Sequence, residues 1–521
     1  MEYRLVFDAG SKILKCAIAD EYNTIIALES IIPEVVQSED GFGRSWKITD
    51  YWTNLLQLAE KTIKKASIDS QKVRYVTSST IRPSCVFSDE DFNPLYIGSS
   101  FDILGIHYGD EIEDQFSELT GESMYQSTGH FPSFLMPPAR FEWLRNNPDF
   151  IDNKTIAHYI PLDSWILMKL GGEFHTNYTS AMESGFFDVR NKHWHDEWYS
   201  IFDIDDSFFP YPVLSGEIIG NVSNKIAEKL KLSSDTEIVA GITDTQAALL
   251  ASNSINPGDI GVVLGSTTPV QAVADKFYIS DKERVWTTGI LVKNLCDNYI
   301  VESNMGITGQ VIKWAAHLFS SKNNKEISEP TTKQYADLGK HYQEFDVFEQ
   351  EESLENVSSH GVYANLGPST LESASSERSG GEFYFPSPGG VNEFFITQKQ
   401  LIGAVFDNII FAVARNIEIA TEIAQLDKFS LAVLGGLSRY NLLCQRTADL
   451  HNNPVKYLIN PEASIQGLLL ICDVASETIK NPSDLEKRLD EKGELNQLNP
   501  RSSMTQKLHA KYKKWVSITK I

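Results

Sequence analysis

A glycine turn between two apolar runs, within residues 4–20, restricts the fold more than any other feature of this sequence. The segment RLVFDAGSKILKCAIAD predicts a strand, a tight turn at DAGSK and a second strand. In a dinucleotide-binding fold the glycine turn would lead into a helix, whereas here β-forming residues resume at once. We therefore expect a β-hairpin at this position rather than the start of a Rossmann unit.

The turn of this hairpin contains residues that suit a phosphate ligand. Gly10 would allow the backbone to approach a phosphate closely, and Asp8 is able to hold Mg²⁺ through water. A plain hairpin turn without a ligand explains the same residues. The segment alone leaves both interpretations open.

A second stretch, residues 241–274, combines an acidic side chain with another loop of small residues. Asp244 lies between a glycine turn and the Thr245 hydroxyl, where a helix beginning TQAALLA starts. A loop of Gly, Ser and Thr at 265–268 follows an apolar strand at 260–264, and such loops offer backbone N–H groups to a phosphate. The pairing suggests phosphoryl transfer, although aspartate is also a common helix N-cap.

Length and composition limit the class of protein. A chain of 521 residues is too long for a single hydrophobic core, so at least two domains are expected. The net charge of -24 disfavours DNA, RNA and anionic lipid as partners. There is no run of about 18 apolar residues and no apolar leader near Met1, so we expect a cytoplasmic protein with no membrane partner. The five isolated cysteines predict reduced thiols and no structural zinc.

Hydrophobic periodicity and turn residues place further elements along the chain. Helices are predicted at 49–68, 137–147, 163–170, 401–423 and 462–476, strands at 73–78, 285–291, 299–302 and 429–434, and a hairpin turn at 89–94. Two polar segments, 320–357 and 372–382, are predicted to be mobile surface insertions, either a lid or plain loops. A charged tail follows at 479–521.

Single residues next to these elements are candidates for binding. Arg82, after the strand at 73–78, either reaches substrate oxygens or stabilises a surface turn. Glycines at the start of a helix near Gly309, and paired glycines at 435–436 after a strand, would allow a nucleotide to approach the backbone. His193 and His195 do not share one helical face, so a metal site is not expected there.

Taken in order, five motifs resemble those of the FGGY carbohydrate kinases, which belong to the sugar kinase, actin and Hsp70 superfold. DAGS at 8–11 resembles the first phosphate motif, usually D-x-G-T, and PPARFEWLRNN resembles the signature P-x-x-K-L-x-W-L. GITDT resembles G-x-x-D-T, and LGSTTP resembles the second phosphate motif. AVLGGLSRYNLLCQRTADLHNNPV resembles the adenosine motif, with its paired glycines, Gln445, Asp449 and Pro454 in register. The resemblance covers most of the chain.

This resemblance implies an α/β fold of two actin-like (ribonuclease H-like) domains, with the active site in the cleft between them. Residues 1–241 would form the first domain, which binds the sugar and carries the first phosphate motif. Residues 242–478 would form the second domain, which binds the nucleotide. The tail at 479–521 would pack back on one of the domains.

The resemblance also implies roles for individual residues, with ATP and Mg²⁺ as cofactors. Asp244 would be the general base that takes the proton from a substrate hydroxyl, and Asp8 would hold the metal. Arg82, Asp102 and Asp244 would contact the substrate. Nucleotide contacts are implied for Gly10, Ser11, Lys12, Gly265, Ser266, Gly309, Lys313, Gly435 and Gly436.

The implied substrate is a small sugar or polyol, and a ketopentose such as xylulose or ribulose is favoured. Phe101-Asp102 stands where many members of the family have W-x-D or W-Q, and Ile81-Arg82-Pro83 stands where xylulokinases have M-H and glycerol kinases have R-E. Kinases of the autoinducer-2, glycerol or gluconate type are therefore alternatives. A sensor that binds nucleotide and sugar without catalysis is an alternative of another class, and we consider a homodimer as the assembly.

Overall fold

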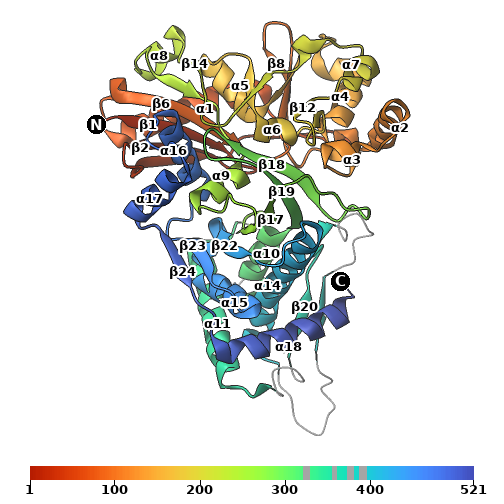
Figure 1. The fold of residues 1–521 in the computed structure, drawn as a ribbon, viewed down its shortest axis with the longest axis vertical. Coiled ribbons are helices and arrows are strands. Elements are labelled where there is room, and N and C mark those ends of the chain that lie inside the picture. Colours follow the sequence, from red (N-terminus) through yellow and green to blue (C-terminus); the bar gives the residue numbers. More distant parts are fainter. Residues whose placement is uncertain (321–328, 355–360, 372–380, 386–395, 521) are drawn as a thin grey trace.

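The computed structural model describes residues 1–320, 329–354, 361–371, 381–385 and 396–520 (Figure 1). In this structure the chain forms two lobes, each built around a mixed β-sheet. The helices within the described ranges include none that is long and apolar enough to cross a membrane.

The sheet of the first lobe has six strands in the order β14-β15-β6-β1-β2-β3. Its strands are β1 (Tyr3–Ala9), β2 (Leu14–Asp20), β3 (Ile25–Ile31), β6 (Val73–Thr80), β14 (Ile218–Asn221) and β15 (Glu237–Val239). The strands β1 and β2 pair antiparallel along their whole length, which confirms the predicted hairpin. Three helices cover one face of the sheet: α1 (Ile48–Ala66), α5 (Leu162–Leu170) and α8 (Asn224–Leu230).

The outer part of the first lobe is a smaller, aromatic-rich layer. Its five-stranded sheet contains β4 (Val35–Gln37), β5 (Arg44–Trp46), β8 (Pro94–Gly98), β7 (Cys85–Ser88) and β9 (His158–Pro161). The hairpin predicted around 89–94 is the antiparallel pair of β7 and β8. Short elements complete the layer: α2 (Gly109–Thr120), α3 (Met124–Thr128), α4 (Pro137–Asn146), β10 (His175–Asn177), α6 (Tyr178–Met182), β11 (Phe187–Asp188), β12 (His193–Trp194), α7 (Glu197–Phe202) and β13 (Tyr211–Val213).

The sheet of the second lobe has seven strands in the order β18-β19-β17-β16-β22-β23-β24. They are β16 (Asp259–Val263), β17 (Thr268–Ala274), β18 (Trp286–Val292), β19 (Cys296–Met305), β22 (Ser430–Leu434), β23 (Val455–Leu458) and β24 (Leu495–Leu498). The main core lies between this sheet and the helices α10 (Thr308–Ser320), α11 (Thr332–Glu351), α14 (Gln398–Ile423), α15 (Asn441–His451) and α18 (Ser502–Thr519). A short ribbon pairs β20 (Tyr363–Asn365) with β21 (Glu382–Tyr384).

Two helices join the lobes. The helix α9 (Asp244–Ala251) packs against α16 (Ala463–Ala475), and α16 also contacts β1 and β6 of the first sheet (Figure 1). At the crossing point a Cβ atom on Gly467 would lie 2.0 Å from the carbonyl oxygen of Ala247. Only glycine allows this approach, so the two helices are held in close contact.

The prediction of a mobile insertion at 320–357 is wrong for much of that segment. Residues 332–351 form the helix α11, which begins with a capping box between Thr331 and Gln334. Tyr342 and Phe345 on this helix are buried in the core of the second lobe. The polar residues on the opposite face masked the apolar stripe in the sequence. The segments 321–328, 355–360 and 372–380 lie outside the described residues, so the remaining part of this prediction is untested there.

The segment 479–521 forms α17 (Pro482–Lys492), β24 and α18. The helix α18 is fixed by a buried ionic cluster that contains Arg446, Lys511, Glu349, Asp407 and Asp346. Arg446 is fully buried and donates to all three carboxylates over 2.7–2.9 Å. Lys511 pairs with Glu349 and Asp407, so α11, α14, α15 and α18 are connected through charged groups.

We expect Lys511→Met to destabilise the second lobe by about 3–5 kcal/mol, because the change removes one of the two cations that neutralise the buried carboxylates of Glu349 and Asp407. Lys514→Met is the matched control, since Lys514 lies on the exposed face of the same helix. Urea denaturation followed by circular dichroism would measure both variants. Equal midpoints for the two variants would show that the buried cluster does not hold α18 in place.

Candidate active site

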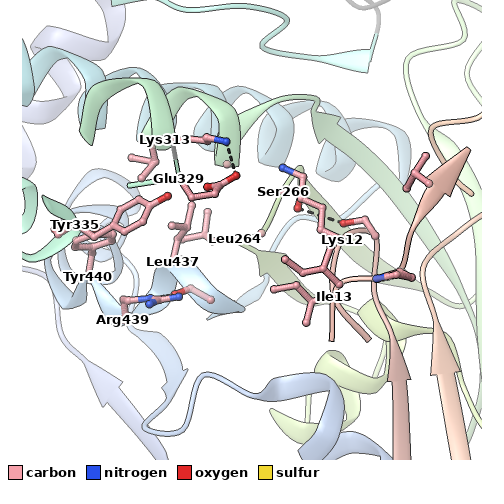
Figure 2. Close-up of a pocket in the computed structure, with 18 of the residues that line it drawn as sticks. Lys12, Ile13, Leu264, Ser266, Lys313, Glu329, Tyr335, Leu437, Arg439 and Tyr440 are labelled. Carbon is pink, nitrogen blue, oxygen red and sulfur yellow. Dashed lines mark hydrogen bonds and ion pairs between the residues drawn. The ribbon is translucent and has the colours of Figure 1, made fainter. Parts of the chain in front are cut away.

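A cavity of about 600 Å³ lies between the two lobes (Figure 2). We call it the interlobe cavity. Residues that the sequence predicted as nucleotide contacts line it: Ser11, Lys12, Gly265, Ser266, Gly309, Lys313 and Gly436. Gly10 and Gly435 each directly precede a lining residue. The structure thus gathers into one place residues that are separated by more than 400 positions in the sequence.

At one end of the interlobe cavity, the turns after β1 and β16 face each other. The hydroxyl oxygens of Ser11 and Ser266 are 3.3 Å apart, although they belong to different lobes. The Gly309 N–H donates to the Ser266 carbonyl over 3.0 Å. A Cβ atom at position 309 would lie 3.0 Å from the Cα of Ser266, so a side chain where α10 begins would press on the Ser266 loop.

The opposite end of the interlobe cavity is aromatic. Figure 2 shows Tyr335 and Tyr440 close together at this end, with Lys12 and Ser266 at the other. The Tyr440 hydroxyl donates to the Tyr335 carbonyl over 3.0 Å, which ties α11 to the loop before α15. Gly435 has a φ of +86°, and a Cβ atom there would lie 2.7 Å from the Leu264 carbonyl oxygen. The backbone can therefore turn into the cavity only at a glycine.

Lys313 and Glu329 form an ion pair on the wall of the interlobe cavity. Glu329 is largely exposed, so the Lys313 ammonium can exchange this partner for another anion at little cost. Sequence reasoning missed Glu329 and Tyr335 because both lie in the segment that was predicted to be mobile. The apolar spacing of Leu338, Tyr342 and Phe345 was the available signal for a helix there.

Two acidic side chains, Asp8 and Asp244, lie near each other outside the lining of this cavity, and Asp8 is on β1, which leads to the lining residue Ser11. The Ser79 hydroxyl donates to Asp8 over 2.9 Å, and burial raises the pKa of Asp8. Asp244 is the first residue of α9, whose N-cap is Thr243, so Asp244 does not have the capping role that was the alternative. Its Oδ1 accepts only the adjacent Thr245 N–H among the described hydrogen bonds, over 2.8 Å.

The environment of Asp244 is acidic. Burial raises the pKa of Asp244 to about 7; the nearby Arg82 opposes the rise, and the carboxylates of Asp8 and Glu183 add to it. The backbone fixes this position, because a Cβ atom on Gly241 would lie 1.8 Å from the Ser78 carbonyl oxygen at the end of β6. The loop before Asp244 can follow this path only with glycine at 241.

Arg82 lies at the centre of a buried polar group that joins the lobes, which we call the Arg82 cluster. Its members are Arg82, His130, Glu183, Gln246, Gln271 and Glu302. The Arg82 guanidinium donates over 2.7 Å to Glu183 of the first lobe and over 2.7 Å to Glu302 on β19 of the second. The Arg82 side chain is only 7% exposed, which removes the alternative of a surface arginine.

One histidine and two glutamines complete the Arg82 cluster. His130 lies 3.0 Å from Glu183, Gln246 donates to Glu183 over 3.1 Å, and Gln271 donates to Glu302 over 2.9 Å. Burial alone would raise the pKa of Glu183, but Arg82 and His130 lower it to about 2. Sequence reasoning missed these partners because each is an isolated polar residue in a separate segment, and only the fold brings them together.

Lys15 is a further residue that the sequence analysis missed. It lies on β2 beside Asp8 and forms an ion pair of 2.5 Å with Glu462, just before α16. Burial lowers the pKa of Lys15, but Asp8 and Glu462 outweigh burial and the net shift is upward. A lysine within an otherwise apolar strand was the signal that could have identified it.

The structure corrects the assignment of Asp102 to the substrate. Asp102 is fully buried, and its two oxygens accept the backbone N–H groups of Arg44 over 2.8 Å and Leu104 over 2.9 Å. It lines neither the interlobe cavity nor the Arg82 cluster. Asp102 therefore holds two backbone segments together, because both of its oxygens accept backbone N–H groups inside the outer layer.

Comparison with known proteins identifies relatives of this arrangement. Residues 3–251 match the N-terminal domain of the FGGY family of carbohydrate kinases. The chain is 26% identical over 475 residues to the putative sugar kinase YoaC of Bacillus subtilis, and the aligned region covers 90% of this chain and 89% of that protein. It is 21% identical, over an alignment of 533 positions, to the probable L-xylulose kinase of Haemophilus influenzae, and the alignment covers 100% of this chain and 99% of that protein.

A solved structure also shares the fold. Xylulose kinase from Rhodospirillum rubrum matches with a TM-score of 0.79 and 16% identity, covering 100% of this chain and 98% of that one. This likeness confirms the predicted fold class of two actin-like α/β domains.

We expect Asp8→Asn to lower the pKa of Asp244 from about 7 toward the ordinary aspartate range, because the change removes a neighbouring negative charge. Carbon NMR of protein labelled at the aspartate carboxyl groups would follow the titration. The Asp244→Asn variant would identify the resonance by its loss. An unchanged Asp244 pKa in Asp8→Asn would show that the two acids do not interact.

Proposed function

The chain belongs to the FGGY family of carbohydrate kinases, and on this premise we propose that it phosphorylates a hydroxyl of a small sugar or polyol with ATP. The observation that carries the proposal is that β1, which carries Asp8, leads to the cavity-lining turn and that Asp8 lies near Asp244. Ser11 and Ser266 line the cavity, and Asp8 on the strand before Ser11 is close enough to Asp244 to raise its pKa. Nucleotide and substrate would meet where the lobes face each other.

The two ends of the interlobe cavity suit the two parts of a nucleotide. Tyr335, Tyr440 and Gly436 offer an aromatic and backbone surface for the adenosine. Ser11, Ser266 and the helix start at Gly309 offer hydroxyl and N–H groups for the phosphates. Lys12 supplies a positive charge on the same side, so the terminal phosphate would lie toward Asp8 and Asp244.

Asp244 has the properties of a general base. Its carboxylate has one described hydrogen bond and a pKa of about 7, so a substantial fraction is ionised near neutral pH and can accept a proton. A substrate hydroxyl held beside Asp244 would lose its proton as its oxygen attacks the phosphorus. The bond between that phosphorus and the β-phosphate oxygen breaks on the opposite side, so ADP leaves in line with the attack.

Magnesium fits the donor set at this place. Within the described ranges no group of three or more His, Cys, Asp or Glu side chains could hold a metal alone. Mg²⁺ usually keeps several waters and is held by one or two carboxylates together with substrate phosphates. Asp8 would provide such a carboxylate next to the phosphate end of the cavity. When bound, the ion would neutralise charge on the phosphoryl oxygens.

A ketopentose is the substrate that we propose. The probable L-xylulose kinase of Haemophilus influenzae matches this chain over its whole length, which supports a five-carbon ketose. Arg82 would position the substrate hydroxyls beside Asp244. Turnover measured by coupled ADP release over pentuloses, polyols, hexonates and the autoinducer-2 precursor would test the proposal. Nucleotide binding without turnover of any sugar would favour the sensor alternative.

We expect Asp244→Asn to lower turnover by about 10² to 10⁴, the usual loss when a general base is removed. The amide keeps the shape of the side chain but cannot take the proton, so nucleotide affinity should stay close to that of the wild type. Steady-state kinetics and calorimetry would measure the two quantities. Asp275→Asn, at an exposed position of the same lobe, is the control. Wild-type turnover in Asp244→Asn would reject Asp244 as the base.

We expect Gly436→Val to weaken ATP binding by about tenfold or more, which corresponds to about 1.4 kcal/mol. Gly436 lines the interlobe cavity, and the nearest atom to an added Cβ there is Arg439 Nη2 at 3.4 Å. The side chain therefore fits the fold but occupies space needed by the adenosine. Calorimetry with ATP and with sugar would separate the effects, and equal loss of both affinities would indicate misfolding instead.

A further inference from the structure

The charges around Arg82 are unusual for a site that recognises substrate oxygens. Arg82 is a single guanidinium that two glutamates contact at 2.7 Å, one from each lobe. Both glutamate side chains are at least 97% buried, so water screens these ion pairs poorly. The positive charge of Arg82 is therefore more than balanced before any substrate arrives.

Additional acids surround this group. Arg82, Asp8 and Glu183 are all close enough to Asp244 to influence its pKa. Lys15, which lies opposite Asp8 on the neighbouring strand, is itself paired with Glu462. Lys12 lines the interlobe cavity, on the side of the phosphate turn. Among the residues that the structure describes here, negative charge exceeds positive charge, and both Arg82 and Lys15 have carboxylate partners.

The guanidinium still has hydrogen-bonding capacity. An arginine side chain has five N–H donors, and the bonds to Glu183 and Glu302 use one on each terminal nitrogen. The remaining N–H groups can donate to hydroxyl or carbonyl oxygens, which need no net charge. A carboxylate ligand would instead have to enter a region of net negative charge, and it would gain little from a cation that two glutamates already neutralise.

We propose that Glu183 and Glu302 make the site selective for uncharged polyols and ketoses and exclude sugar acids such as aldonates. This inference rests on the proposed function, since it assumes that the substrate binds beside Arg82 and Asp244. Glu302 and Glu183 act through Arg82 as positioning residues. Their shared role also requires both lobes, because each lobe supplies one of the two carboxylates.

An alditol and its aldonate provide the test, because they differ only in one terminal group, CH₂OH or carboxylate. Binding of xylitol and xylonate, and of glucitol and gluconate, would be measured by calorimetry with a non-hydrolysable ATP analogue and Mg²⁺ present. Turnover of the same compounds and of D-xylulose would be measured in parallel. We expect the neutral member of an accepted pair to bind about 100-fold or more tightly than the acid, because the carboxylate would enter a region of net negative charge.

Glu302→Gln should lower the ratio of neutral to acidic ligand affinity by about tenfold, because one carboxylate fewer would neutralise Arg82 and a substrate carboxylate could pair with it. Glu183→Gln should act in the same direction from the other lobe. Glu477→Gln, at an exposed glutamate, changes the net charge equally and should leave the ratio unchanged. A general packing defect would weaken both members of each pair and would not move the ratio.

The outcomes separate the two proposals. Tighter binding of the aldonate by the wild type, or an unchanged ratio in both glutamate variants, would overturn the charge inference while leaving the kinase proposal intact. Selective binding of the neutral compounds without turnover of any sugar would reject the kinase proposal and support the charge inference. Selective binding with turnover of the neutral compounds would support both.

Discussion

The packing of α9 against α16 is the constraint on which the candidate site depends. At their crossing, Gly467 leaves no room for even a methyl group beside Ala247. The same α16 packs on β1 and β6, the strands that carry Asp8 and lead to Arg82. Since α9 begins at Asp244, one interface sets the relative positions of all three side chains. A displacement of α16 would therefore change the distance between Asp8 and Asp244.

Burial acts in the same direction on Asp244 and Glu183, yet their pKa values move apart. Burial raises the pKa of Asp244 to about 7, while the charge of Arg82 and the contact with His130 outweigh burial at Glu183 and lower its pKa to about 2. The difference comes from which carboxylate the guanidinium contacts. One arginine thus keeps one acid permanently ionised and leaves the neighbouring acid able to exchange a proton near neutral pH.

The sequence was most informative where function depends on local backbone shape. The turns around Gly10, Gly265 and Gly435 could be predicted because glycine and small polar residues directly after an apolar run are typical of tight turns. Glu183 and Glu302 could not be predicted, since their meeting at Arg82 depends on tertiary packing between lobes. The error at 320–357 arose because amphipathic α11 has a polar outer face. Asp102 was misplaced because a motif position indicates where a residue lies but not whether backbone amides occupy its oxygens.

The return of α16 to the first lobe has a consequence for how this protein can be divided. One face of the first sheet, including Val6, Ala17 and Val239, forms a common core with α9 and α16. A fragment that ends near residue 241 would expose this apolar face to water, which favours aggregation. The two lobes are thus not interchangeable modules. Recombination between relatives would have to exchange the segment 463–475 together with the first sheet to preserve a matched core.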